Sequence, residues 1–223
     1  MPDNMLATRS TLYGAVSALF SDPESEKFSI IMASGLQGEI LDACFQLEER
    51  GNQNKITLSG LFKKLMSNLK KSKMTKIRNE FVDVFGHTLS KQIAPYALEH
   101  LKNSDVFYRT QKLADLNGFY KAFGMEVESI ERADHISTQT EFLSFLLLKE
   151  WLADQNDLYD EKEICGKAFA DFHNDHFFDW VEMFSQNLAK HVDGEFYSFA
   201  GKFLSEFLRK EKTEFHTSKA LQR

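Results

Sequence analysis

Apolar residues recur at helical spacing along most of the chain, and the strongest pattern lies between residues 129 and 151. The first half of this stretch is polar and ends in the pair Asp134-His135. The second half carries six Phe or Leu residues within positions 142–148, so its apolar surface extends most of the way round a helix. A helix that is apolar on most sides is a buried helix. We therefore expect a central helix over about 135–152, with Asp134 as its N-cap, because a carboxylate there can accept from the free N–H groups of the first turn.

The same spacing predicts helices on both sides of this segment. The ranges that show it are 7–20, 25–50, 58–69, 77–85, 105–123, 177–188 and 196–207. Residues 154–163 have the composition of an acidic linker, and the periodicity ends after Glu211. The pattern therefore predicts an all-α protein, a single-domain bundle of about eight to ten helices. This domain is expected to span residues 1–212, with a frayed tail at 213–223.

The helical spacing is weak between residues 86 and 103, around Pro95. We interpret this part as a long loop with at most a short helical turn. Long ordered loops in compact domains often carry function. The Pro95 loop and the Asp134-His135 pair are therefore the first places to look for a site.

Composition narrows the class of protein. Three prolines and 11 glycines in 223 residues agree with a mostly helical chain. The net charge of −6 disfavours binding to nucleic acid and favours a basic partner, and we interpret the lysines of 63–78 as a solvated helix face. Two cysteines make neither a disulfide framework nor a zinc site. No secretory signal pattern and no apolar segment of spanning length is present, so we expect a cytoplasmic protein without stable membrane insertion.

Several fragments, in chain order, resemble the TorD/DmsD/NarJ family of molybdoenzyme maturation chaperones. E-R-A-D-H-I-S-T-Q-T-E-F-L-S-F-L (131–146) looks like the family signature in which Asp-His opens a helix and Glu-Phe follows. A-P-Y-A-L-E-H (94–100) resembles the family's proline-tyrosine loop, although here the acidic residue does not directly follow the tyrosine. Weaker matches are R-S-T-L-Y-G-A-V-S-A-L-F-S-D-P, E-F-V-D-V-F-G, N-G-F-Y-K-A-F-G-M and H-F-F-D-W. Together they cover nearly the whole chain.

This resemblance implies an all-helical cytoplasmic chaperone without catalytic residues or cofactor. Such proteins bind the twin-arginine leader, or the corresponding N-terminal segment, of a molybdopterin oxidoreductase subunit and hold it until the cofactor is inserted. By resemblance, the leader-binding region maps onto Tyr96, Glu99, Asp134 and His135. A cationic pair followed by an apolar stretch needs carboxylates and an apolar groove. The further candidates for these roles are Glu131, Phe81, Phe85 and Phe142.

Other hypotheses stay open from the sequence. Asp134-His135 could serve only to cap a helix, or could be the centre of a metal- or nucleotide-dependent all-α enzyme. Spacings such as Glu131/His135 and His173/His176 could belong to a metal site, but no second motif supports one, and we expect no bound metal. A helical adaptor for another peptide is a third hypothesis. A homodimer is possible, with 154–163 as a hinge.

Overall fold

A computed structural model describes residues 5–49, 56–86, 93–101, 105–127, 131–191 and 194–221, with side chains up to residue 213. In these ranges the chain is helical, with one isolated β-bridge and no strand, which confirms the all-α class. The α-helices are α1 (Met5–Leu19), α2 (Glu26–Ile30), α3 (Ser34–Glu49), α4 (Leu58–Lys71), α5 (Met74–Phe85), α6 (Val106–Ala122), α7 (Ile136–Gln155), α8 (Tyr159–Phe172), α9 (Phe178–His191) and α10 (Phe196–Leu221). A short 3₁₀ helix (Ala97–His100) and a π-helical turn (His173–Phe177) complete them.

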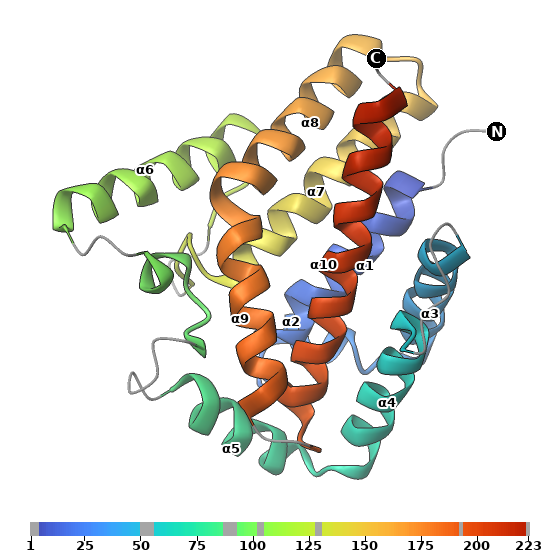
Figure 1. The fold of residues 1–223 in the computed structure, drawn as a ribbon, viewed down its shortest axis with the longest axis vertical. Coiled ribbons are helices and arrows are strands. Elements are labelled where there is room, and N and C mark those ends of the chain that lie inside the picture. Colours follow the sequence, from blue (N-terminus) through green and yellow to red (C-terminus); the bar gives the residue numbers. More distant parts are fainter. Residues whose placement is uncertain are drawn as a thin grey trace.

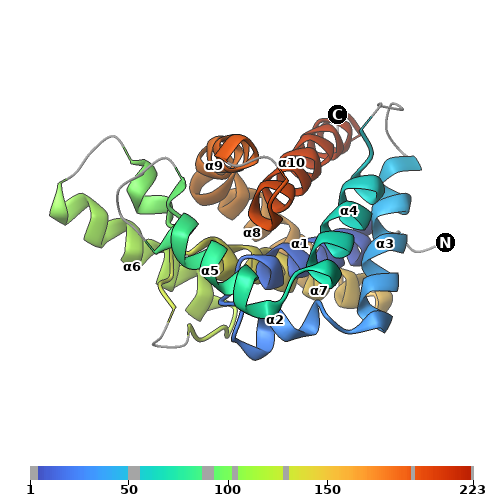
Figure 2. The same cartoon turned by 90° about the horizontal axis from the view of Figure 1, so that it is seen from below.

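Helix α7 is the central helix that the apolar pattern predicts. It packs on α1 along one side and on α8 along another, while α9 and α10 pack against each other. Its first turns are buried even at polar positions, including Ser137, Gln139 and Thr140. Figures 1 and 2 show α7 and α1 inside the bundle, with α3 and α4 at one edge and α6 at the opposite edge. The buried central helix predicted at about 135–152 is therefore confirmed.

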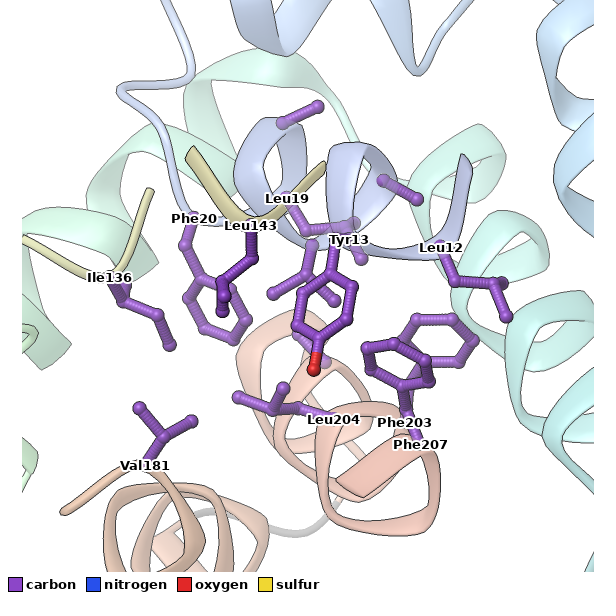
Figure 3. Close-up of a cluster of buried hydrophobic side chains, with 14 of the residues drawn as sticks. Leu12, Tyr13, Leu19, Phe20, Ile136, Leu143, Val181, Phe203, Leu204 and Phe207 are labelled. Atoms are coloured by element: carbon purple, nitrogen blue, oxygen red, sulfur yellow. The ribbon is translucent and has the colours of Figure 1, made fainter. Parts of the chain in front are cut away.

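The core is built largely from aromatic side chains around Tyr13 of α1. Its ring lies edge-on to Phe207 of α10, with 4.9 Å between centroids. Figure 3 shows this ring enclosed by side chains of α1, α7, α9 and α10. The Tyr13 hydroxyl donates to Glu211 Oε2 at 2.9 Å, and the Arg9 guanidinium donates to both oxygens of the same carboxylate at 2.8 Å. A charged network thus joins the first and last helices inside the core.

One boundary differs from the sequence prediction. The acidic segment 154–163 is not a linker, because α7 continues to Gln155 and α8 begins at Tyr159. Acidic residues are favourable in the first turn of a helix, and Asp160 and Glu161 lie there. At the end of the chain, the backbone of α10 is helical to Leu221.

Helix α6 extends along the edge of the molecule and leaves much of its surface to solvent (Figures 1 and 2). Asp105 caps its first turn by accepting from the Phe107 N–H at 3.0 Å. The Phe107 side chain itself is 86% exposed, whereas Leu116 and Tyr120 anchor the other end of the helix in the core. Taken over the described ranges, no helix combines the length and the apolarity needed to cross a membrane.

Candidate functional site

The loop around Pro95 and the start of α7 are joined directly. Tyr96 and His135 form an antiparallel β-bridge, in which the Ala97 N–H donates to the Asp134 carbonyl at 2.9 Å and the Ile136 N–H donates to the Pro95 carbonyl at 2.8 Å. The rings of Tyr96 and His135 lie 5.0 Å apart. The two motifs that the sequence singles out therefore form one structural unit.

The Asp134 carboxylate holds this unit together. It accepts from Arg132 Nε and Nη2, both at 2.9 Å, and from the Leu98 N–H at 3.1 Å. Its side chain is fully buried. The sequence predicts Asp134 as the N-cap of α7, and this prediction is wrong. The Asp134 oxygens accept from the 3₁₀ turn and from a neighbouring guanidinium instead.

His135 caps α7 instead. Its Nδ1 accepts from the Ser137 N–H at 3.3 Å, which requires this nitrogen to be unprotonated. Burial, with the nearby charges of Lys27 and Arg132, lowers the pKa of His135 to about 3. The 3.5 Å contact between Nδ1 and the Glu131 carboxylate is therefore not an ion pair at neutral pH. Asp134 makes no hydrogen bond to the imidazole, so the pair lacks the geometry of a catalytic dyad.

The carboxylates expected to meet a leader already have internal partners. Glu99 accepts from Arg109 at 2.6 Å and lies 3.8 Å from Arg132. Arg132 also stacks on Tyr96, with its guanidinium carbon 4.4 Å from the ring centroid. Of the predicted carboxylates, only Glu131 is partly exposed without an arginine partner, and burial raises its pKa.

The three predicted groove phenylalanines have different positions. Phe142 is fully buried, and its ring contacts the rings of Tyr120 and Phe172 at 4.9 Å. The prediction that Phe142 lines a peptide groove is therefore wrong. Its side chain points from α7 into the core between α6 and α8. Phe81 and Phe85 are half-buried on α5, where both rings pack on Tyr197.

A cavity of about 270 Å³ is lined in part by the 3₁₀ turn. It lies between this turn, α6, and the junction of the π-helical turn with α9. Its apolar wall includes Leu98, Leu101, Leu116, Trp180 and Met183. Its polar residues are His100, Tyr108, Lys112, Asn174, Asp175, His176 and Asp179. The loop that carries Tyr96 therefore forms one wall of a mixed apolar and acidic cavity.

The charge of this cavity comes from carboxylates without internal partners. Asp175 and Asp179 are exposed and make no ion pair with any residue that the structure describes. Burial lowers the pKa of His100 and of His176, so both are neutral at neutral pH. Lys112 is the cation that lines the cavity. From the sequence, Asp175 and Asp179 are considered only as neighbours of His173/His176 in a metal site and not as ligands of a peptide, because only the fold reveals what faces them.

The sequence leaves a metal site open at Glu131/His135 and at His173/His176. Where the structure describes the chain, no three His, Cys, Asp or Glu side chains gather closely enough to hold a metal ion. His173 is buried beside Phe169, with a ring-centroid distance of 5.7 Å, and burial lowers its pKa to about 4. It serves as a packed core side chain.

Comparison with known proteins identifies the family. The family model described as nitrate reductase delta subunit matches residues 52–186, which is more than half of the chain. The fold is similar to a crystal structure from Archaeoglobus fulgidus, described as that of a candidate redox enzyme maturation protein, with a TM-score of 0.51, 18% identity, and coverage of 90% of this chain and 93% of that chain. No curated protein matches the sequence. The chain belongs to the nitrate reductase delta subunit family, whose members are maturation chaperones of molybdoenzymes.

Proposed function

We propose that this protein is a cytoplasmic chaperone that binds the twin-arginine leader, or the corresponding N-terminal segment, of a molybdopterin oxidoreductase subunit until its cofactor is inserted. The observation that carries the proposal is the cavity lined in part by the 3₁₀ turn. A wall of Leu98, Trp180 and Met183 suits an apolar peptide segment, and the unpaired carboxylates beside it suit arginines. The protein acts by binding and carries out no reaction of its own.

Asp134 and His135 contribute to this function as positioning residues. Both are almost completely buried, so neither presents a surface to a peptide. Asp134 fixes the Leu98 N–H, and the bridge between Tyr96 and His135 fixes the loop on α7. The apolar wall of the cavity is thereby held in place before a peptide arrives, which reduces the entropic cost of binding.

The energy required is modest. A micromolar dissociation constant corresponds to about 8 kcal/mol. A charge-assisted hydrogen bond contributes about 1.5–3 kcal/mol, and burial of apolar surface contributes about 25 cal/mol per Å². These gains must also offset about 4–15 kcal/mol of lost translational and rotational freedom, so two arginine contacts require several buried leader side chains beside them.

Calorimetric titration with synthetic leader peptides tests the proposal. The probes are leaders of several molybdoenzyme subunits, and the control is a leader of the same length in scrambled order. We expect at least one genuine leader to bind at micromolar concentration and the scrambled peptide not to bind. Failure of every leader and of every N-terminal segment tested would refute the proposed function.

A further inference from the structure

Resting on this proposed function, we infer that Asp175 and Asp179 bind the two leader arginines and that Met183 receives the apolar residues that follow. All three side chains line the same cavity, and they are spaced four residues apart along the π-helical turn and α9. The structure thus assigns the charged end of the peptide to α9 and not to Asp134-His135, which do not line this cavity.

The other carboxylates near the loop are poor acceptors for an incoming guanidinium. Asp134 is fully buried and already binds Arg132 in a bidentate manner. Glu99 is 25% exposed and is paired with Arg109 at 2.6 Å. An arginine from outside would have to displace an internal arginine from either site, with little net gain, because one guanidinium–carboxylate pair would replace another.

Asp175 and Asp179 do not have this problem. Both are exposed and lack ion-pair partners in the described part of the chain. Residues four apart on a helix lie about 5–6 Å from each other on one face. Consecutive arginines have Cα atoms about 3.8 Å apart, and their long side chains can reach two such carboxylates.

The order of side chains along α9 matches the order of a leader. The two carboxylates come first, and Met183, which is 45% exposed, follows one turn later. Methionine is unbranched and adapts to different apolar partners. Across the cavity, Lys112 of α6 opposes binding of any cation. The site therefore has two carboxylates against one amine, and the half-buried histidines, whose pKa values are lowered, add no charge at neutral pH.

A double-mutant cycle tests this assignment. The test variant carries both Asp175→Asn and Asp179→Asn. The two peptides are a leader that binds the wild type and the same leader with both arginines replaced by glutamine. Asp171→Asn is the matched control, because Asp171 is exposed on α8 and does not line the cavity. Lys112→Gln removes the positive charge of the cavity and should therefore have the opposite effect on binding. Circular dichroism verifies that each variant retains its helix content.

We expect the double Asn variant to bind the leader at least about tenfold more weakly, since two charge-assisted contacts are lost. The glutamine leader should bind this variant and the wild type equally, Asp171→Asn should change nothing, and Lys112→Gln should tighten binding of the arginine leader. Unchanged affinity for the arginine leader, or equal losses for both leaders, would overturn the assignment while the proposed function stands. If the wild type binds no leader at all, the proposed function and this assignment fail together.

Discussion

At the scale of single residues, the most informative side chain is Asp134. It satisfies the Leu98 N–H, binds the Arg132 guanidinium and lies beside the His135 cap. Arg132 in turn covers the Tyr96 ring. A short acidic side chain therefore links the two motifs of the family, and its role is to shape the loop.

Replacement of Asp134 should show this role. In Asp134→Ala the Leu98 N–H loses its acceptor and Arg132 loses its bidentate partner, so we expect the free energy of unfolding to fall by about 2–4 kcal/mol. Urea denaturation measures the loss. Asp171→Ala, at an exposed position, should cost less than about 0.5 kcal/mol. Equal stability of the two variants would mean that Asp134 is not a structural anchor.

The buried imidazole of His135 should make stability depend on pH. Burial lowers its folded pKa from 6.5 to about 3. Between these values the unfolded chain binds a proton that the folded chain does not, so stability is fully present above pH 6.5 and is lost as the pH falls. From pH 7 to pH 5 this single group should remove about 2 kcal/mol.

The variant His135→Asn isolates this effect. Asparagine is a favourable N-cap and does not titrate, so the variant should retain the start of α7 while losing the pH dependence. Urea unfolding at pH 7 and at pH 5 should show a drop about 2 kcal/mol larger for the wild type than for the variant. Since His100, His173 and His176 also have lowered pKa values, the comparison must be made between the two proteins and not on the wild type alone.

At the scale of elements, the helices are connected by carboxylates as well as by apolar packing. Glu80 of α5 accepts from the Phe196 and Tyr197 N–H groups at 3.2 and 2.6 Å and so caps α10 from another helix. Glu211, near the other end of the described α10 side chains, binds Arg9 and Tyr13 of α1. Both contacts fix the position of α10 in the bundle.

Loss of Arg9 should be costly because it leaves a buried charge without its partner. Glu211 is fully buried and Arg9 is 13% exposed. We expect Arg9→Met to lower the free energy of unfolding by about 3–5 kcal/mol, the usual effect of breaking a buried ion pair. Arg209→Met removes a pair with Glu206 in which the arginine is 43% exposed, and should cost at most about 1 kcal/mol. Similar losses in thermal unfolding of the two variants would contradict the structural role of the Arg9 network.

At the scale of the whole molecule, charge is unevenly distributed. Residues 51–79 contain eight of the 27 basic residues and none of the 33 acidic ones. Helix α4, which carries four of these lysines, lies at the edge of the bundle opposite α6 (Figures 1 and 2). Helix α3, which packs against α4, carries the acidic residues Glu39, Asp42, Glu48 and Glu49, so charges of opposite sign lie on these two neighbouring helices.

Binding of a leader should raise the thermal stability of the whole protein. A ligand that binds only the folded state at about 100 times its Kd adds about 2.7 kcal/mol. For a domain of this size, we expect the Tm to rise by about 5–10 °C. Differential scanning fluorimetry with the arginine and glutamine leaders should show the increase with the first peptide only. No shift at saturating leader would contradict binding to the folded state.

Several features could be predicted from the sequence because they depend on local patterns. The apolar run at 142–148 predicts a buried helix, and α7 is that helix. The family motifs predict a common location for Tyr96 and Asp134-His135, and these residues are in direct contact. The start of α8 could not be predicted from the sequence, because its acidic first turn has the composition of a loop. The homodimer and the domain boundary at 212 stay predictions.

The all-α class, the central helix and the two motifs can be read from the sequence alone, since helical periodicity and motif spacing are properties of neighbouring residues. Which carboxylates remain available to a partner depends on how the helices pack. Asp134 is paired with Arg132, and Glu99 is paired with Arg109. Asp175 and Asp179 line a cavity and have no ion-pair partner among the described residues. The physical reason is that a charge is neutralised by whatever the fold brings within a few ångströms of it, and that distance cannot be obtained from the order of residues along the chain.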